Sequence, residues 1–303
     1  MEAWVLITIA AAFLQNARSA LQRMLKGRLG GAGATFVRFG FGLPFAALYA
    51  AAVWSWQGAI PGPTAPWALF LTLGAIAQIL ATAALLASFS HENFAVGTAY
   101  SKTEPIQAAV FGAVLLGEAP SAVASLAIAV GVAGVVLMSW KPGGDGSGLR
   151  RYLGPAALLG LGSAALFGVS AAAYRAASLS LTEGDAMIRA ATTLAAATAV
   201  QTVLMGAWMA WRAPKELRAV GAAWRPGLLV GFCGAAASAG WFTAMTLEPV
   251  AHVRALGQVE ILFTVLVSAF VFRERPSARD LFGVALVVLG VLLLLRATGG
   301  LAL

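Results

Sequence analysis

Charged residues are scarce in this sequence. They make up 11% of its 303 residues, whereas hydrophobic residues make up 60% and the mean hydropathy is +0.85. Soluble globular domains carry about 25% charged residues. A soluble core of this size could not bury so much apolar surface. The composition therefore excludes an ordinary soluble domain and predicts a chain surrounded by lipid.

Cysteine and histidine are almost absent as well. Cys233 is the only cysteine, which excludes an intrachain disulfide and a cysteine-bound metal cluster. His91 and His252 are too few for a histidine metal site. The sequence also lacks the P-loop, His-Glu-x-x-His and Gly-x-Ser-x-Gly motifs. We expect no cofactor, no metal and no enzyme activity, and the missing P-loop argues against an ATP-driven pump.

Apolar runs of about 20 residues, the length that crosses a bilayer as a helix, recur along the chain. The runs do not alternate between apolar and polar positions, which argues against a β-barrel. The sequence predicts an all-α membrane protein with ten transmembrane helices, at 3–23, 33–56, 66–88, 94–116, 122–139, 153–179, 185–211, 226–246, 250–272 and 278–296.

The chain repeats itself. A shift of 156 residues aligns several charged and turn residues of the two halves: Glu104 with Glu260, Glu118 with Glu274, Pro120 with Pro276, Ser121 with Ser277 and Gly134 with Gly290. Because five helices are an odd number, the second copy enters the membrane from the opposite face. We predict two inverted five-helix repeats, 1–140 and 153–303, joined by a cytoplasmic linker at 141–152. Such repeats place a binding site near the midplane.

Loop charges predict the orientation. Thirteen basic residues lie on the face reached after the first span, and the opposite face has Arg296 alone. By the positive-inside rule the first face is cytoplasmic, which places both termini in the periplasm of a bacterial inner membrane. This use of the basic residues also explains the net charge of +8 without a nucleic-acid partner. Tryptophans near span ends are expected to form an interfacial belt: Trp54, Trp56, Trp67, Trp140, Trp208, Trp211 and Trp224.

Two carboxylates lie deep in predicted spans. Glu104 and Glu260 are near the middle of the fourth and ninth spans, where a charge is costly unless it faces a cavity or a partner. One interpretation is a proton-coupling site or a site for a substrate amine. The alternative is a structural ion pair with arginine or lysine that locks the two halves together. The sequence leaves both open.

Basic and polar residues within the spans are further candidates. Arg38 and Arg189 could bind a substrate carboxylate or phosphate, or could instead snorkel to headgroups or pair with a repeat glutamate. Lys102 is a candidate for a substrate carboxylate, and its counterpart Gln258 is neutral. Within the spans, the basic residues Arg38, Lys102 and Arg189 outnumber the acidic residues Glu104 and Glu260, which favours a zwitterionic or anionic solute. The residues expected to line a cavity are Tyr100, Gln78 and Trp241, whereas Arg18, Arg175 and Arg254 lie nearer span ends and are expected at the interface.

Two stretches carry a family resemblance. Thr103-Glu104-Pro105, followed by 114–121 and a Gly-rich span, resembles the drug/metabolite transporter superfamily of the EamA type, and 260–277 with 283–290 looks like its second copy. The resemblance implies secondary transport of small metabolites, often export of amino acids, from a cavity between the halves. Members of this family usually have both termini in the cytoplasm, whereas the loop charges here indicate the reverse.

The leading hypothesis is a secondary active exporter of small polar metabolites, working by alternating access with protons as the candidate coupling ion. Its partners would be a small-molecule substrate and the bilayer, with the choice between monomer and homodimer open. A multidrug exporter would need an aromatic cavity with an unpaired carboxylate. A membrane-embedded lipid-modifying enzyme would need catalytic groups clustered near one interface, and a channel would need a ring of like residues.

Overall fold

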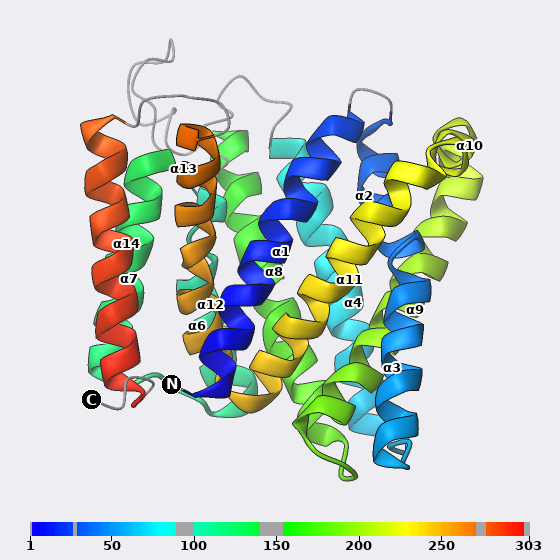
Figure 1. The fold of residues 1–303 in the computed structure, drawn as a ribbon, viewed down its shortest axis with the longest axis horizontal. Helices are drawn as coiled ribbons and strands as arrows, with labels where there is room; N and C mark the ends of the chain where they lie inside the picture. The colour runs from blue at the N-terminus through cyan, green and yellow to red at the C-terminus, as the bar shows by residue number, and fades with distance from the viewer. Residues whose placement is uncertain (1, 27–28, 89–99, 140–153, 271–276, 300–303) are drawn as a thin grey trace. The chain divides into compact units, whose positions relative to one another are not determined.

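The computed structural model describes residues 2–26, 29–88, 100–139, 154–270 and 277–299, and these segments contain helices and no strands (Figure 1). The predicted linker at 141–152 and the beginning of the predicted span 94–116 lie outside them. The helices are α1 (Ala3–Lys26), α2 (Gly31–Gly40), α3 (Leu43–Gln57), α4 (Ala65–Ser88), α6 (Glu104–Leu116), α7 (Ala122–Ser139), α8 (Pro155–Ser180), α9 (Ala186–Arg212), α10 (Pro214–Ala222), α11 (Trp224–Leu247), α12 (Val250–Leu256), the 3₁₀ turn η2 (Gly257–Val259), α13 (Glu260–Phe270) and α14 (Ala278–Ala297).

Within these segments, six helical stretches are long and apolar enough to cross a membrane, and two shorter apolar helices cover Glu104–Leu116 and Ala122–Met138. The all-α membrane class is therefore confirmed. The bounds of most predicted spans agree with the observed helices to within a few residues. The count of ten spans stays a prediction. Among the described residues, six stretches have spanning length and two further apolar helices are shorter.

Four predicted elements differ from the structure, and one of them is the span 94–116, which a turn at Lys102 and Thr103 interrupts before α6. The predicted span 33–56 is broken at Phe41 and Gly42 into α2 and α3, because Pro44 in the first turn of α3 has no N–H to continue the ladder from α2. The predicted span 250–272 is interrupted by η2. The predicted loop between Arg212 and Pro226 contains the short helix α10.

The helices form two compact units, and each unit combines segments from both halves of the sequence. Unit 1 contains residues 1–9, 80–172 and 249–303, and unit 2 contains 10–79 and 173–248. In unit 1, α7 packs against α14 and α6 against α12. In unit 2, α9 packs against α2, α3 and α11. Several packed pairs, such as α7 with α14, are therefore counterparts in the sequence repeat.

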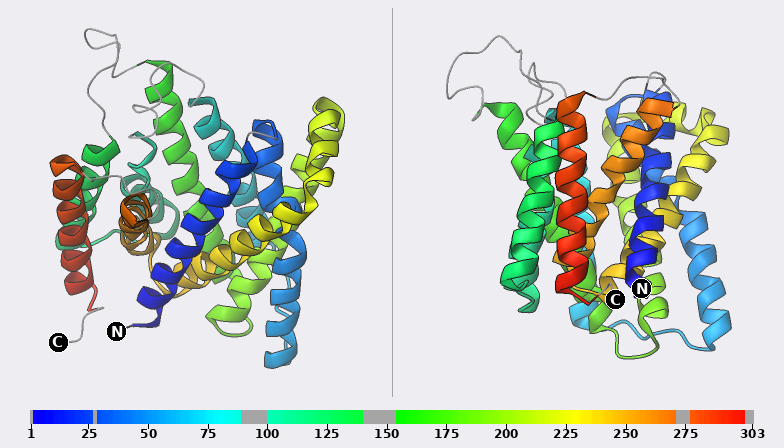
Figure 2. Two further views of the ribbon diagram at one scale, coloured as in Figure 1. Left: turned by 45° about the horizontal axis from the view of Figure 1, so that its top comes forward. Right: turned by 60° about the vertical axis from the view of Figure 1, so that its left-hand side comes forward.

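Helices α7 and α14 lie side by side in unit 1 (Figures 1 and 2). They approach so closely that a Cβ atom on either of two glycines would touch the backbone of the other helix. A Cβ atom on Gly134 would lie 2.6 Å from the Gly283 oxygen and 3.0 Å from the Val287 nitrogen. A Cβ atom on Gly290 would lie 2.8 Å from the Ala127 oxygen and 2.7 Å from the Gly131 nitrogen. The two helices are antiparallel, because late residues of α7 meet early residues of α14.

These contacts are reciprocal. The 156-residue shift aligns Ala127 with Gly283, Gly131 with Val287 and Gly134 with Gly290. Each backbone contact of Gly134 therefore corresponds to a backbone contact of Gly290. An antiparallel pair with exchanged contacts is what two oppositely oriented copies of one helix produce. The crossing also explains the glycines, since close backbone packing replaces the missing hydrophobic force between helices in lipid.

Replacing Gly134 with leucine should disrupt this crossing, because its side chain would overlap the Gly283 backbone. We expect the free energy of unfolding, measured by SDS titration in mixed micelles, to fall by about 2 kcal/mol or more. Ala133→Leu is the matched control, since Ala133 is exposed on the same helix and its substitution should change stability by less than about 0.5 kcal/mol. Equal effects of the two substitutions would contradict the assignment.

Candidate substrate site

A polar pocket lies within unit 2, between α2, α4, α9 and α11. Its cavity volume is about 10 Å³, space for about one water molecule. Two residues singled out from the sequence, Arg38 and Gln78, both line it. The full lining is Arg38, Phe39, Gly42, Gln78, Leu194, Ala197, Thr198, Gln201, Gly234, Ala235, Ser238 and Phe242. The break between α2 and α3 at Gly42 thus lies at the pocket wall.

Two amides and a phenol form a hydrogen-bonded network beside the pocket. The Gln201 amide nitrogen donates to Gln78 Oε1 at 2.6 Å and to Tyr174 Oη at 3.0 Å, and Tyr174 Oη donates to Gln78 Oε1 at 3.3 Å. Gln201 and Tyr174 are 3% and 2% exposed. Buried polar groups held by several bonds keep one geometry. The sequence analysis missed Gln201 and Tyr174, although a glutamine within an apolar span is itself a signal.

Arg38 provides the positive charge of the pocket. It lies in the last turn of α2, half-buried, with its guanidinium carbon 5.3 Å from the centre of the Phe39 ring. A Cβ atom on Gly234 would lie 3.6 Å from Arg38 Cγ and 3.4 Å from Arg18 Cδ, so two arginine stems pack on this glycine of α11. The described lining residues include no acid. A guanidinium with amide and hydroxyl groups nearby suits a carboxylate or a phosphate.

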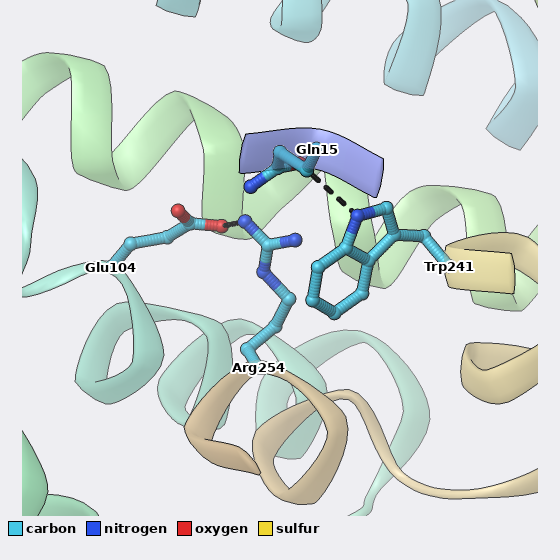
Figure 3. A network of polar contacts seen from close by, with 4 residues as sticks. All are labelled: Gln15, Glu104, Trp241 and Arg254. Atoms are coloured by element: carbon cyan, nitrogen blue, oxygen red, sulfur yellow. Dashed lines mark hydrogen bonds and ion pairs between the residues drawn. The ribbon is translucent and has the colours of Figure 1, made fainter. Parts of the chain in front are cut away.

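Unit 1 contains a different polar arrangement, an ion pair between Glu104 and Arg254 (Figure 3). Their side chains are 16% and 17% exposed. Glu104 is the first residue of α6 and Arg254 lies in the last turn of α12, so both charges are also favoured by their helix ends. Arg254 was expected at the interface, but it pairs with a residue of the other sequence half. The interpretation of Glu104 as one half of a structural ion pair predicts such a partner.

The second repeat glutamate occupies the equivalent place. Glu260 is the first residue of α13, directly after η2, just as Glu104 begins α6 before Pro105. The helix break is therefore repeated at the 156-residue shift. Each glutamate, expected in the middle of a continuous helix, instead lies at a helix N-terminus. Broken helices of this kind are typical of ion and substrate sites in transporters.

The other candidates in unit 1 lie just before α6, Tyr100 at a helical position and Lys102 in the turn that follows it. Tyr100 and Lys102 are half-buried, and the Tyr100 carbonyl accepts a hydrogen bond from the Thr103 hydroxyl at 2.7 Å. The counterpart of Lys102 is Gln258, whose Oε1 would lie 2.5 Å from a Cβ atom on Gly131 of α7. Gln258 thus packs against the α7 helix.

Trp241 and Arg189 belong to unit 2 but are not among the described lining residues of the pocket. Trp241 is 6% exposed and donates to Gln15 Oε1 at 3.1 Å (Figure 3). Arg189 donates to the carbonyl of Asp185, just before α9, and to the carbonyl of Leu181, just after α8. The pKa of the Asp185 carboxyl is lowered by a hydrogen bond from the Gln57 amide, by the N–H groups of 187 and 188 and by the nearby Arg189 charge. Arg189 therefore stabilises a helix start.

Arg175 does not snorkel as expected. It is 7% exposed, and one guanidinium nitrogen donates to the carbonyls of Met245 and Glu248. These carbonyls lie at the end of α11, where no intrahelical donor remains. Arg175 is therefore a buried connection between α8 and α11. Trp54 and Trp67, expected in the interfacial belt, likewise donate to Thr192 and Thr193 of α9.

Both sequence halves match the family model of EamA-like transporters, at residues 2–140 and 154–296. The chain belongs to the EamA-like transporter family. The resemblance seen in the Glu104 and Glu260 segments is thereby confirmed, and the two matched ranges confirm a two-repeat architecture. An EamA-like protein is a membrane transporter of the drug/metabolite type, with a small-molecule substrate and the bilayer as partners.

Solved structures share the fold of this EamA-like chain, and 27 of their chains match it. One, titled "Crystal structure of protein", is 19% identical, with a TM-score of 0.76 over 100% of this chain and 99% of its own. At this identity the likeness concerns the fold alone. None of the curated proteins compared with the chain matches it.

The ion pair of this EamA-like protein can be tested by a double-mutant cycle. Glu104→Gln or Arg254→Gln leaves a partly buried charge without its partner, and each should lower the free energy of unfolding by about 2–3 kcal/mol. The double substitution should cost less than the sum of the two by about 1 kcal/mol or more, measured by SDS titration. Strictly additive effects would show that the two side chains do not interact.

Proposed function

We propose that the protein is a secondary active exporter of small polar metabolites that carry a carboxylate, amino acids or related zwitterionic or anionic compounds. The observation that carries this proposal is the polar pocket of unit 2, in which Arg38 lies among amide and hydroxyl groups with no acid in the described lining. Arginine can bind a carboxylate through two parallel hydrogen bonds, and the Gln78–Gln201–Tyr174 network offers fixed polar groups nearby.

The same observations count against a multidrug exporter. A site for lipophilic cations requires an acidic group facing an aromatic cavity. Here the charged residue in the pocket is a guanidinium, and Glu104 is paired with Arg254. A lipid-modifying enzyme, which would need catalytic groups clustered near one interface, stays the second alternative.

The proposed architecture is two inverted five-helix repeats, 1–140 and 153–303, joined by the segment 141–152. The reciprocal contacts of α7 and α14 and the matching helix starts at Glu104 and Glu260 support it. Inverted repeats allow alternating access by exchange of conformations between the two copies. The loop charges support a bacterial inner-membrane protein with periplasmic termini.

Arg38 is the residue whose replacement tests substrate binding. In inside-out proteoliposomes with labelled amino acids and organic acids, Arg38→Gln should slow initial uptake at low substrate about tenfold or more, because a charge-assisted hydrogen bond is lost. Arg296→Gln removes an exposed arginine on α14 and should leave uptake unchanged. Wild-type transport of lipophilic cations, with carboxylates ignored, would instead support the multidrug alternative.

Glu104 and Glu260 are proposed to couple transport to protons, and loss of the Glu104 charge would remove the partner that pairs with Arg254. We expect Glu104→Gln or Glu260→Gln to abolish uptake driven by a pH gradient while exchange of labelled for unlabelled substrate continues. Glu118→Gln, just after the end of α6, is the matched control and should keep gradient-driven uptake. Full gradient-driven uptake in both glutamate variants would remove the coupling hypothesis.

A further inference from the structure

The short helix α10 has an unusual position for a connection between two spans. It joins α9 to α11, and both of these are long and apolar enough to cross a membrane. Figure 1 looks along the axis of α10, whereas α9 and α11 run across the view. A helix that runs across the direction of the spans it connects lies along the membrane surface, at the depth of the lipid headgroups.

One face of α10 is fixed to unit 2. Leu217 and Val220 pack against an apolar cluster that includes Leu29 and Val37. The carboxylate of Glu216 accepts a hydrogen bond from the Gly33 N–H at 2.9 Å, at the beginning of α2. The partial positive charge of that helix end stabilises the carboxylate. The one acid of α10 is therefore turned inward.

A neighbouring glycine makes this contact possible. A Cβ atom on Gly30 would overlap the Glu216 carboxyl group, so a side chain there would displace the carboxylate. Glu216 and the first turn of α2 are thus fitted to each other. This contact fixes which residues of α10 face outward.

The outward face of α10 is cationic. Lys215 and Arg218 are exposed one turn apart, and the exposed Arg212 and Arg225 flank them at the ends of α9 and α11. We call these four residues, together with Trp211 and Trp224, the α10 patch. The Arg212 guanidinium lies 4.1 Å from the Trp211 ring centre and that of Arg225 lies 5.4 Å from the Trp224 ring centre. Both tryptophans are large exposed apolar groups, 73% and 50% accessible.

We propose that the α10 patch binds the headgroup phosphates of anionic phospholipids in the leaflet where α10 lies. Lysine and arginine near a membrane surface attract anionic lipids, and clusters on an amphipathic helix do so additively. The exposed indoles favour a lipid over a soluble phosphate, because tryptophan prefers the boundary between headgroups and acyl chains. The inward-facing Glu216 leaves no acid of α10 to oppose the bound phosphate.

The test measures lipid binding directly. The purified full-length protein is titrated with phosphatidylglycerol or phosphatidylcholine in detergent, and bound lipids are counted by native mass spectrometry. We expect phosphatidylglycerol to bind more tightly than phosphatidylcholine. Arg218→Gln should weaken phosphatidylglycerol binding about fivefold, and Lys215→Gln with Arg218→Gln roughly 25-fold. Arg296→Gln, which removes an exposed arginine elsewhere, should leave binding unchanged.

Three results would overturn the proposal. They are equal binding of the two lipids, unchanged phosphatidylglycerol binding in the double variant, or displacement of the lipid by millimolar glycerol phosphate, which would indicate a site for soluble anions. The thermal unfolding temperature in lipid-free detergent should be the same for all variants. If Arg218→Gln lowers that temperature, Lys215→Gln alone provides the comparison, with the same fivefold expectation.

Discussion

The backbone of a chain surrounded by lipid must satisfy its own hydrogen bonds, and the rest of this structure depends on that constraint. Lipid offers no donors or acceptors, so a helix can be interrupted only where other protein groups or a hydrated cavity receive the exposed backbone groups. The interruptions seen here are few and lie beside polar features. The break at Gly42 borders the pocket with Arg38, and helices begin at Glu104 and Glu260 in unit 1. Polar chemistry and helix breaks therefore occur together.

Duplication explains how one short sequence unit produces a large part of this arrangement. Two copies of one helix, α7 and α14, pack on each other through glycines that exchange their contacts. No hydrophobic effect drives helices together in lipid, so close backbone contact between small residues has to stabilise this pair. Functional differences arise where the copies diverge. Lys102 corresponds to Gln258, and the network around Gln201 belongs to unit 2 alone among the described residues.

Much of the fold could be predicted from the sequence, because span length and apolar composition are local properties. The bounds of most helices, the repeat and the family follow from residues read along the chain. The candidate site was predicted in part: Arg38 and Gln78 were singled out as polar residues within spans, and the structure brings them to one pocket. The partner of Glu104 was not predicted, because Arg254 is 150 residues away and only tertiary packing brings the two together.

Other departures have equally local causes that sequence periodicity hides. Arg175 looked shallow by its place in the span, but its buried position follows from the unfilled carbonyls at the end of α11. The break at Gly42 follows from Pro44, a signal that membrane helices often tolerate without breaking. Helix α10 was missed because nine residues with three charges resemble a loop in sequence. The hydrogen bond of Glu216 with the beginning of α2 is a tertiary contact that the sequence does not reveal.

The ion pair of Glu104 with Arg254 has an energetic consequence for a cycle built on two exchanging copies. At the 156-residue shift, the residue that corresponds to Arg254 in the first copy is Thr98, whose neutral side chain cannot form an ion pair with Glu260. If the copies trade conformations, the mirror state contains no equivalent of this pair. The inward-open and outward-open forms would then differ in free energy, so that the empty carrier rests in one of them. A tenfold preference corresponds to about 1.4 kcal/mol, well within the reach of one such contact.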